Sequence, residues 1–210
     1  MYKYIDIFMS SYYITYILGH LLQYCGMTQT VLRGKWASRF IGAAIFQGAL
    51  ATILTLYVVL GQLWFLRPEV SRVIAFGSAG TWFTLGYALY LVIGVLGVAV
   101  TALFYHYIEN VLGKVYTGAA NILAWIHLIL MNVGVIGATW LMMTAGYQGG
   151  AAMLPPEVGG LGWNAGQVHT NIFYGVPLGY PFWIAGSIIL LAIGVLLGGL
   201  GYVITWRRKL

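Results

Sequence analysis

The stretch that decides the fold runs from Thr117 to Gly146 and reads TGAANILAWIHLILMNVGVIGATWLMMTAG. His127 is the one side chain in it that can carry a charge near neutral pH. About 20 apolar residues are enough for an α-helix to cross the hydrocarbon core of a bilayer. This stretch is longer than that, so it is predicted to be a transmembrane helix.

Polar and small residues occupy two faces of this predicted helix. At about 100° per residue, Asn121, Asn132 and Thr139 fall on one face. Lipid cannot satisfy an amide or an imidazole, so both faces should contact protein or a bound group. The helix is therefore expected inside a bundle. Its second face carries Ala120, Ala124, His127, Gly134 and Ala138.

The composition of the whole chain extends this conclusion beyond one helix. Of its 210 residues, 61% are hydrophobic and only 7% are charged, and the mean hydropathy is +0.87. Soluble domains carry about 25% charged residues. The predicted fold is an all-α, polytopic membrane helix bundle that forms a single transmembrane domain over residues 1–210. Five transmembrane helices are expected at about 5–26, 40–66, 73–107, 117–146 and 182–206, with a long outer loop at 147–180.

The positions of the basic residues predict the orientation of the bundle. Cytoplasmic loops of membrane proteins carry an excess of Lys and Arg. With the N-terminus outside and the C-terminus inside, only Lys3, Arg67 and Arg72 of the ten basic residues lie outside. The net charge of +6 is therefore attributed to topology and not to nucleic-acid binding. The expected location is the cytoplasmic membrane, with several passes. The inner basic residues are Arg33, Lys35, Arg39, Lys114, Arg207, Arg208 and Lys209.

Catalytic and metal-binding patterns are absent from the sequence. The four acids, Asp6, Glu69, Glu109 and Glu157, all lie at predicted helix ends or in loops. The sequence has no Ser-His-Asp set, glycine-rich phosphate loop or HExxH motif. No catalytic or metal-ligating residue is predicted. Whether the protein is an enzyme stays open, and a subunit of a membrane oxidoreductase complex is favoured over an enzyme acting alone.

Two histidines are the candidate cofactor ligands. His20 lies about six residues from the inner end of the first predicted span, and His127 lies about ten residues into the fourth. At about 1.5 Å per residue the two lie at similar depth. Two imidazoles from different helices could ligate one b-type haem. The alternative is that each histidine forms a hydrogen bond across helices, and the Asn121, Asn132 and Thr139 face has the same interpretation.

A set of residues from Leu103 onward is similar to a known membrane protein family. An aromatic pair precedes a Gly113-Lys114-x-Tyr116 turn, and a helix with His127 near its start follows. This order resembles the C-terminal helices of the large subunit of haem-copper oxidases. The family's preceding helix carries a His-x-His pair, whereas this chain reads LGYALY at 85–90. The resemblance therefore implies a degenerate relative without the haem and copper ligands. The corresponding residues are Phe104, Tyr105, Gly113, Lys114, Tyr116, Trp125, His127, Asn132 and Gly146.

These observations lead to two functional hypotheses. The first is a non-catalytic integral membrane subunit of a respiratory or other oxidoreductase complex. It would pack other integral subunits and membrane lipid, bind no nucleic acid, and hold a b haem at His20 and His127 or line a quinone site. The alternative is a small carrier or channel for a neutral solute. It would use Gln47, the Asn121, Asn132 and Thr139 face, and the glycine-rich outer loop.

Overall fold

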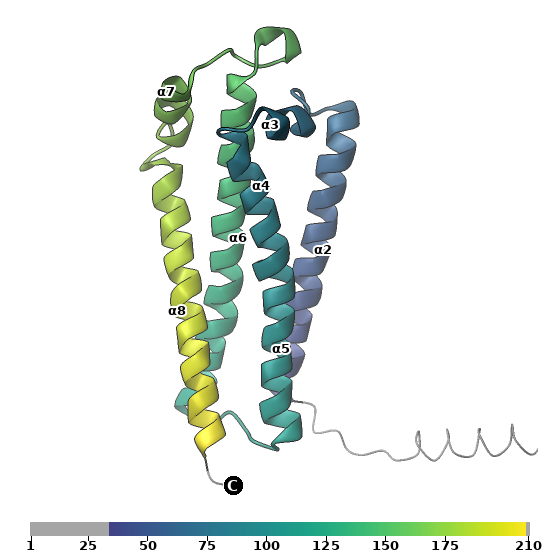
Figure 1. Cartoon of the computed structure of the whole chain (residues 1–210). Helices are drawn as coiled ribbons and strands as arrows, with labels where there is room; N and C mark the ends of the chain where they lie inside the picture. Colours follow the sequence, from purple (N-terminus) through teal and green to yellow (C-terminus); the bar gives the residue numbers. More distant parts are fainter. Residues whose placement is uncertain (1–33, 209–210) are drawn as a thin grey trace, which may run out of the picture. The chain divides into compact units, whose positions relative to one another are not determined.

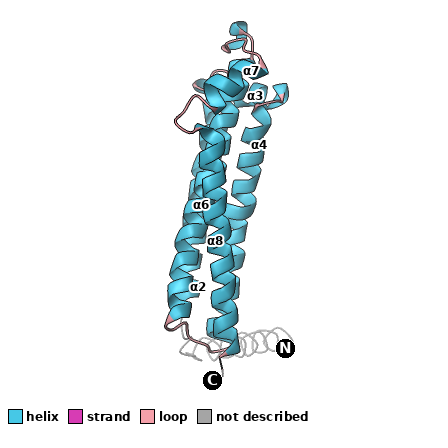
Figure 2. Ribbon diagram, turned by 90° about the vertical axis from the view of Figure 1, so that its left-hand side faces the viewer, coloured by secondary structure: helices cyan, strands magenta, loops and turns pink. Residues whose placement is uncertain are grey.

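The computed structural model describes residues 34–208, which belong to one compact unit that begins at Gly34. Their regular secondary structure is entirely helical (Figure 2). Four helical rods in this part of the chain are long and apolar enough to cross a membrane. Consecutive rods run in opposite directions (Figure 1). They are α2 (Lys35–Trp64), the composite rod Gly80–Val111, α6 (Ala119–Met153) and α8 (Gly179–Arg207).

The composite rod changes helical type along its length. α4 (Gly80–Leu89) leads into the π-helix η1 (Tyr90–Gly97), then into α5 (Val98–His106) and a second π-helix, η2 (Tyr107–Val111). π-Helical turns are rare and often occur at functional sites. In this chain η1 begins at Tyr90, whose side chain is completely buried. The wider turn therefore begins at a residue that is held inside the bundle.

α6 lies between α8 and the composite rod, and its small residues allow both to approach. A Cβ atom at Gly134 would lie 2.6 Å from the backbone nitrogen of Leu191 in α8. At Gly194 it would lie 2.9 Å from the backbone nitrogen of Met131 in α6. Small residues commonly permit such close contact between membrane helices. The predicted stripe on α6 is confirmed as an interior face: Ala120, Ala124, His127, Gly134 and Ala138 are all buried.

The third predicted span, 73–107, differs from the structure at its start. The chain first forms a short helix, α3 (Val70–Phe76), and then turns before α4 begins. Gly77 and Ser78 both have positive φ angles, 73° and 50°, which no α-helix can accommodate. The hydropathy of this region is continuous across the turn, so hydropathy alone does not reveal the break.

The predicted outer loop, 147–180, contains more helix than expected. α6 continues to Met153, and the chain then forms η3 (Pro156–Val158), α7 (Ala165–Val168) and η4 (His169–Phe173). The extension of α6 is stabilised by contacts with α3 and α4 despite its glycines. A Cβ atom at Gly150 would lie 2.6 Å from a methyl carbon of Val73, so glycine permits this contact.

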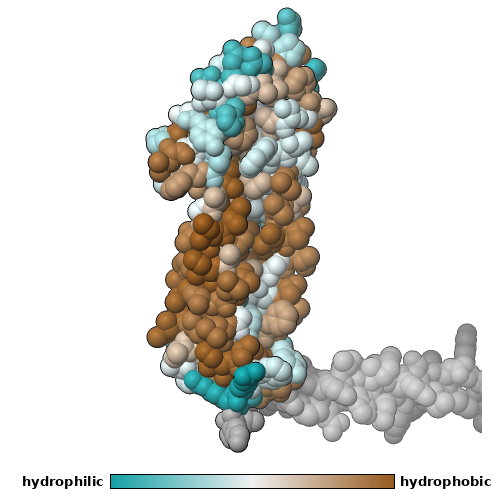
Figure 3. Space-filling model, turned by 60° about the vertical axis from the view of Figure 1, so that its left-hand side comes forward, coloured by the Kyte–Doolittle hydropathy of each residue, from teal (hydrophilic) through white to brown (hydrophobic). Residues whose placement is uncertain are grey.

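The two ends of the bundle differ in charge. We call the end where α2 begins and α8 ends the basic end, and the end with α3, α7 and η4 the loop end (Figure 1). At the loop end, Glu69 pairs with both Arg67 and Arg72. Figure 3 shows a broad hydrophobic band along the rods and hydrophilic residues at both ends of that face. The described basic end carries Lys35, Arg39, Lys114, Arg207 and Arg208.

The described helices support a membrane-spanning helical bundle. The first predicted span, 5–26, lies outside the described residues together with His20. The count of five spans and the orientation with the N-terminus outside therefore stay predictions.

Candidate functional site

His127 lies at the centre of an aromatic cluster in the half of the bundle nearest the basic end. Its side chain is 3% exposed, and its Nδ1 atom is 3.2 Å from the hydroxyl oxygen of Tyr105 in α5. Phe40 of α2 and Tyr202 of α8 complete its surroundings, with ring centroids 5.1 and 5.9 Å away. Side chains from all four rods therefore meet at this histidine.

The backbone of α8 closes the remaining side of the imidazole. A Cβ atom at Gly198 would overlap the ring of His127. The imidazole is therefore in direct contact with the backbone of α8. Among the described residues, no group of three or more His, Cys, Asp or Glu side chains is arranged to hold a metal ion. The proposed partner ligand, His20, lies outside those residues, so the haem pairing stays a prediction.

Three tyrosine hydroxyls accompany the histidine, and we call Tyr105, Tyr116, His127 and Tyr202 the tyrosine–histidine cluster. The hydroxyls of Tyr116 and Tyr202 are buried without a hydrogen-bond partner among the described residues. Burial raises the pKa of the Tyr116 phenol well above its usual value. The Tyr116 phenol is therefore protonated and uncharged. The cluster can donate or accept hydrogen bonds, but it contains no carboxylate that could act as a general base.

A carboxylate beside this cluster stabilises the start of α2. Glu109 of η2 accepts hydrogen bonds from the backbone N–H groups of Trp36 and Ala37, each at 2.9 Å to Oε2. The side-chain oxygen of Asn110 accepts a further bond from the backbone of Gly34 at 3.0 Å. The first N–H groups of a helix have no partner within the helix, and negative charge is favourable there. Glu109 of η2 therefore caps the start of α2. The sequence analysis did not predict this role.

An arginine lies against two tryptophans at the same end. The guanidinium carbon of Arg39 is 4.4 Å from the ring centroid of Trp36 and 4.3 Å from that of Trp125. The indole nitrogen of Trp36 donates a hydrogen bond to Asn121 at 3.1 Å. Cation–π contacts of this kind hold a charged group against aromatic rings where little water is present. Asn121 thus connects α6 to α2, in agreement with its interpretation as an interhelical contact.

A second polar network lies further along the rods. The amide nitrogen of Gln47, a fully buried residue, donates to the Asn132 side-chain oxygen at 2.8 Å. The hydroxyl of Tyr90 donates to the Gln47 side-chain oxygen, also at 2.8 Å. Thr139, the third residue of the predicted polar face, instead bonds the carbonyl of Val135 on its own helix. The residues invoked for a solute path are therefore bonded to other side chains or to backbone.

Four of the residues that carry the oxidase resemblance, Phe104, Tyr105, Tyr116 and Lys114, lie at or near the tyrosine–histidine cluster. Phe104 contacts Tyr202, with ring centroids 5.9 Å apart, and Tyr116 contacts Tyr105 at 5.1 Å. Lys114 donates to the carbonyl of Arg208 at 2.9 Å, just beyond the end of α8. A cation near helix C-terminal carbonyls is favourable.

Comparisons with protein families, with curated proteins and with solved structures find no match for this chain. The resemblance to haem-copper oxidases stays a prediction from the sequence.

Proposed function

We propose that this protein is a non-catalytic integral membrane subunit of a respiratory or other oxidoreductase complex, where it packs against other membrane subunits. The observation that carries the proposal is a set of helical glycines on outward faces of α2 and α8. Gly42 and Gly186 are exposed, Gly199 is half-buried, and a Cβ atom on any of the three would meet nothing within 4 Å.

Other glycines of these rods have a clear role within the bundle. Gly194 and Gly198 place α8 against α6, where a side chain would collide with Met131 or His127. Glycine in a helix costs about 1 kcal/mol relative to alanine, and no packing among the described residues compensates for this cost at Gly42, Gly186 or Gly199. Contact with a helix of another subunit would compensate, because small residues let membrane helices approach closely.

The distribution of polar groups also favours a packing role over transport. Glu109 bonds backbone, and Gln47 bonds Tyr90 and Asn132. A path for a polar solute needs groups that are free to bind it in turn. The oxidoreductase assignment rests on the sequence resemblance together with the tyrosine–histidine cluster.

Site-specific photo-cross-linking in native membranes tests the packing role. A photoreactive phenylalanine analogue replaces Phe46 beside Gly42, or Leu196 beside Gly199, and Val133 of α6 is the control. These three side chains are 58%, 72% and 54% exposed. We expect Phe46 or Leu196 to form a discrete adduct with one integral membrane protein, and Val133 to label lipid. Lipid adducts alone at all three positions contradict the proposal.

The identity of the partner tests the oxidoreductase assignment. Mass spectrometry of the adduct, and of proteins that co-purify at native abundance, should identify subunits that carry redox cofactors. A stable partner set without any redox protein would retain the packing role and overturn the assignment.

The haem hypothesis has a separate optical test. If His127 ligates a haem, a reduced-minus-oxidised spectrum of the haem-loaded protein shows an alpha band that His127→Ala and His20→Ala each abolish. If the wild-type protein shows no such band when haem supply is controlled, His127 is a hydrogen-bonding core residue.

The carrier alternative predicts solute flux into reconstituted liposomes, and that flux should fall in the Asn132→Leu variant.

A further inference from the structure

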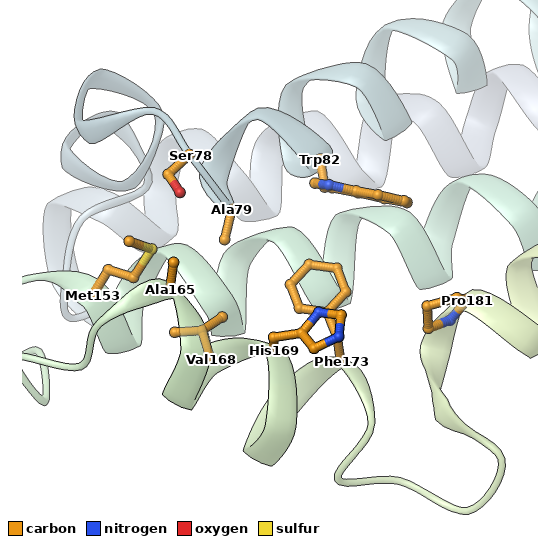
Figure 4. Close-up of a pocket in the computed structure, with 9 residues that line it drawn as sticks. All are labelled: Ser78, Ala79, Trp82, Met153, Ala165, Val168, His169, Phe173 and Pro181. Carbon is orange, nitrogen blue, oxygen red and sulfur yellow. The ribbon is translucent and has the colours of Figure 1, made fainter.

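A pocket opens at the loop end, away from the tyrosine–histidine cluster. Its volume is about 400 Å³, within the range of about 300–1,000 Å³ common for small-molecule sites. It lies between the start of α4, the last turn of α6, the α7–η4 segment and the start of α8. In Figure 4, Trp82 reaches the pocket from α4, and the rings of His169 and Phe173 reach it from η4.

The walls of the pocket are fixed by close packing and hydrogen bonds. Trp82 and Phe173 meet edge to face, with ring centroids 5.5 Å apart and an interplanar angle of 68°. Gly149 of α6 lets this wall approach, since a Cβ atom there would lie 3.1 Å from Phe173 and 2.9 Å from Ala79. At the start of α7, Asn164 and Gln167 bond each other's backbone at 2.9 Å. These contacts hold Trp82, Phe173 and the start of α7 in place.

The chemistry of the lining selects the class of ligand. None of the nine lining residues carries a carboxylate, an ammonium or a guanidinium group. No lining side chain would therefore neutralise the charge of an ionic ligand. Aromatic walls favour a flat ring, which gains offset or edge-to-face contacts. Three hydrogen-bonding groups, the imidazole of His169, the hydroxyl of Ser78 and the indole N–H of Trp82, belong to this otherwise apolar lining. None of the three has a hydrogen-bond partner among the described residues.

We propose that this pocket binds the ring of a neutral, membrane-soluble molecule of the quinone class. The ring rests against Trp82 and Phe173, and His169 donates a hydrogen bond to a ring oxygen. The apolar tail of such a molecule leaves the pocket along the hydrophobic band of the rods. The inference deepens the proposed oxidoreductase role and depends on it for its biological meaning, although the binding itself can be measured alone.

Photoaffinity labelling of the full chain in lipid nanodiscs tests the site. The probe is an azido-benzoquinone with a short alkyl chain, and the competitors are a decyl-substituted benzoquinone and decanol. We expect label on peptides that contain residues 78–82 and 165–181, displaced by the quinone and not by decanol. Equal displacement by decanol, or label spread over all lipid-facing helices, overturns the proposal because it shows only apolar partition.

Variants of the pocket distinguish binding from a loss of fold. Ala165→Trp fills the pocket from its exposed rim and should weaken binding by about tenfold. Ala75→Trp, on the exposed surface of α3 outside the pocket, is the matched control and should leave binding unchanged. His169→Leu should weaken binding by about 2- to 10-fold, whereas His169→Gln, which keeps a donor, should retain most of it. Equal binding by wild type and Ala165→Trp overturns the site.

The proposed ligand site and the proposed complex can be tested separately. Competed label at the pocket without co-purifying redox subunits retains the ligand site and overturns the complex. Co-purifying redox subunits without label at the pocket retain the complex and overturn the ligand site.

Discussion

The imidazole of His127 lies directly on the backbone of Gly198, so that any side chain at residue 198 would overlap it. This contact joins α6 and α8 beside the tyrosine–histidine cluster. The neighbouring Gly199 points away, and a Cβ atom there would meet nothing within 4 Å. Two adjacent glycines on one helix therefore have opposite surroundings.

This difference predicts opposite outcomes for the same substitution. Gly198→Ala should destabilise the isolated protein by about 1–3 kcal/mol, because the added methyl group overpacks the contact with His127. Gly199→Ala should be neutral or slightly stabilising in the isolated protein, because alanine favours helix. Thermal or denaturant unfolding in detergent measures both. Equal effects of the two substitutions would contradict the contact.

The carboxylate of Glu109 should stabilise the start of α2. Glu109→Ala leaves the backbone N–H groups of Trp36 and Ala37 without their acceptor, at a cost of about 1–3 kcal/mol. Glu157→Ala, at an exposed position of the loop end, removes the same charge and is the control. The free energy of unfolding and the hydrogen exchange of residues 35–40 report the loss. Unchanged exchange in Glu109→Ala would show that the carboxylate is no cap.

The buried network of Gln47, Tyr90 and Asn132 should behave as one unit. Hydrogen bonds between membrane helices contribute about 0.6 kcal/mol on average and up to about 1.7. Gln47→Leu and Asn132→Leu should each destabilise the protein, and the double variant should cost less than the sum of the two. A double-mutant cycle of unfolding free energies measures this coupling. Strict additivity would mean that the 2.8 Å contact contributes nothing.

Acid should weaken the ion-pair group at the loop end. A hydrogen bond with its own backbone, together with Arg72 and Arg67, holds the pKa of Glu69 below its ordinary value of 4.5. A lowered pKa means that the folded state favours the carboxylate. Its stabilising contribution is therefore complete above that ordinary value and is lost as pH falls through the lower folded-state pKa.

A carbon NMR titration of the Glu69 carboxyl group measures this shift. We expect its midpoint below 4.5 in the wild type and a rise toward that value in Arg72→Ala. Lys114→Ala, at the basic end, is the control and should leave the midpoint unchanged. A wild-type midpoint at or above the ordinary value would contradict the predicted shift.

Sequence reasoning identified helices and faces more reliably than partners. The α6 face with Ala120, His127 and Ala138 was predicted as interior and is buried, because a helical repeat sets the direction of each side chain locally. The break at Gly77 and Ser78 was missed, since hydropathy does not report backbone angles. The helical end of α6 beyond Gly146 was also missed, because contacts with Val73 and Ala79 stabilise it.

The candidate sites illustrate the same limit. Asn132 and Gln47 were recognised as polar residues in a membrane segment, but Tyr90 as their shared partner was not. Glu109 was placed correctly at a helix end, yet the backbone N–H of Trp36 that it caps lies 73 residues earlier in the chain. No local pattern contains such a pairing. The pocket beside Trp82 likewise combines four elements, and no single segment indicates it.

The sequence by itself determined that the described chain forms long apolar helices with interior faces, because hydrophobic length and helical periodicity depend only on neighbouring residues. Only the tertiary structure decided that His127 meets Tyr105 and Gly198, that Glu109 caps α2, and that a neutral pocket opens between Trp82 and His169. Those relationships depend on which rods lie side by side and at what height. That arrangement is set by close packing between residues far apart in the chain.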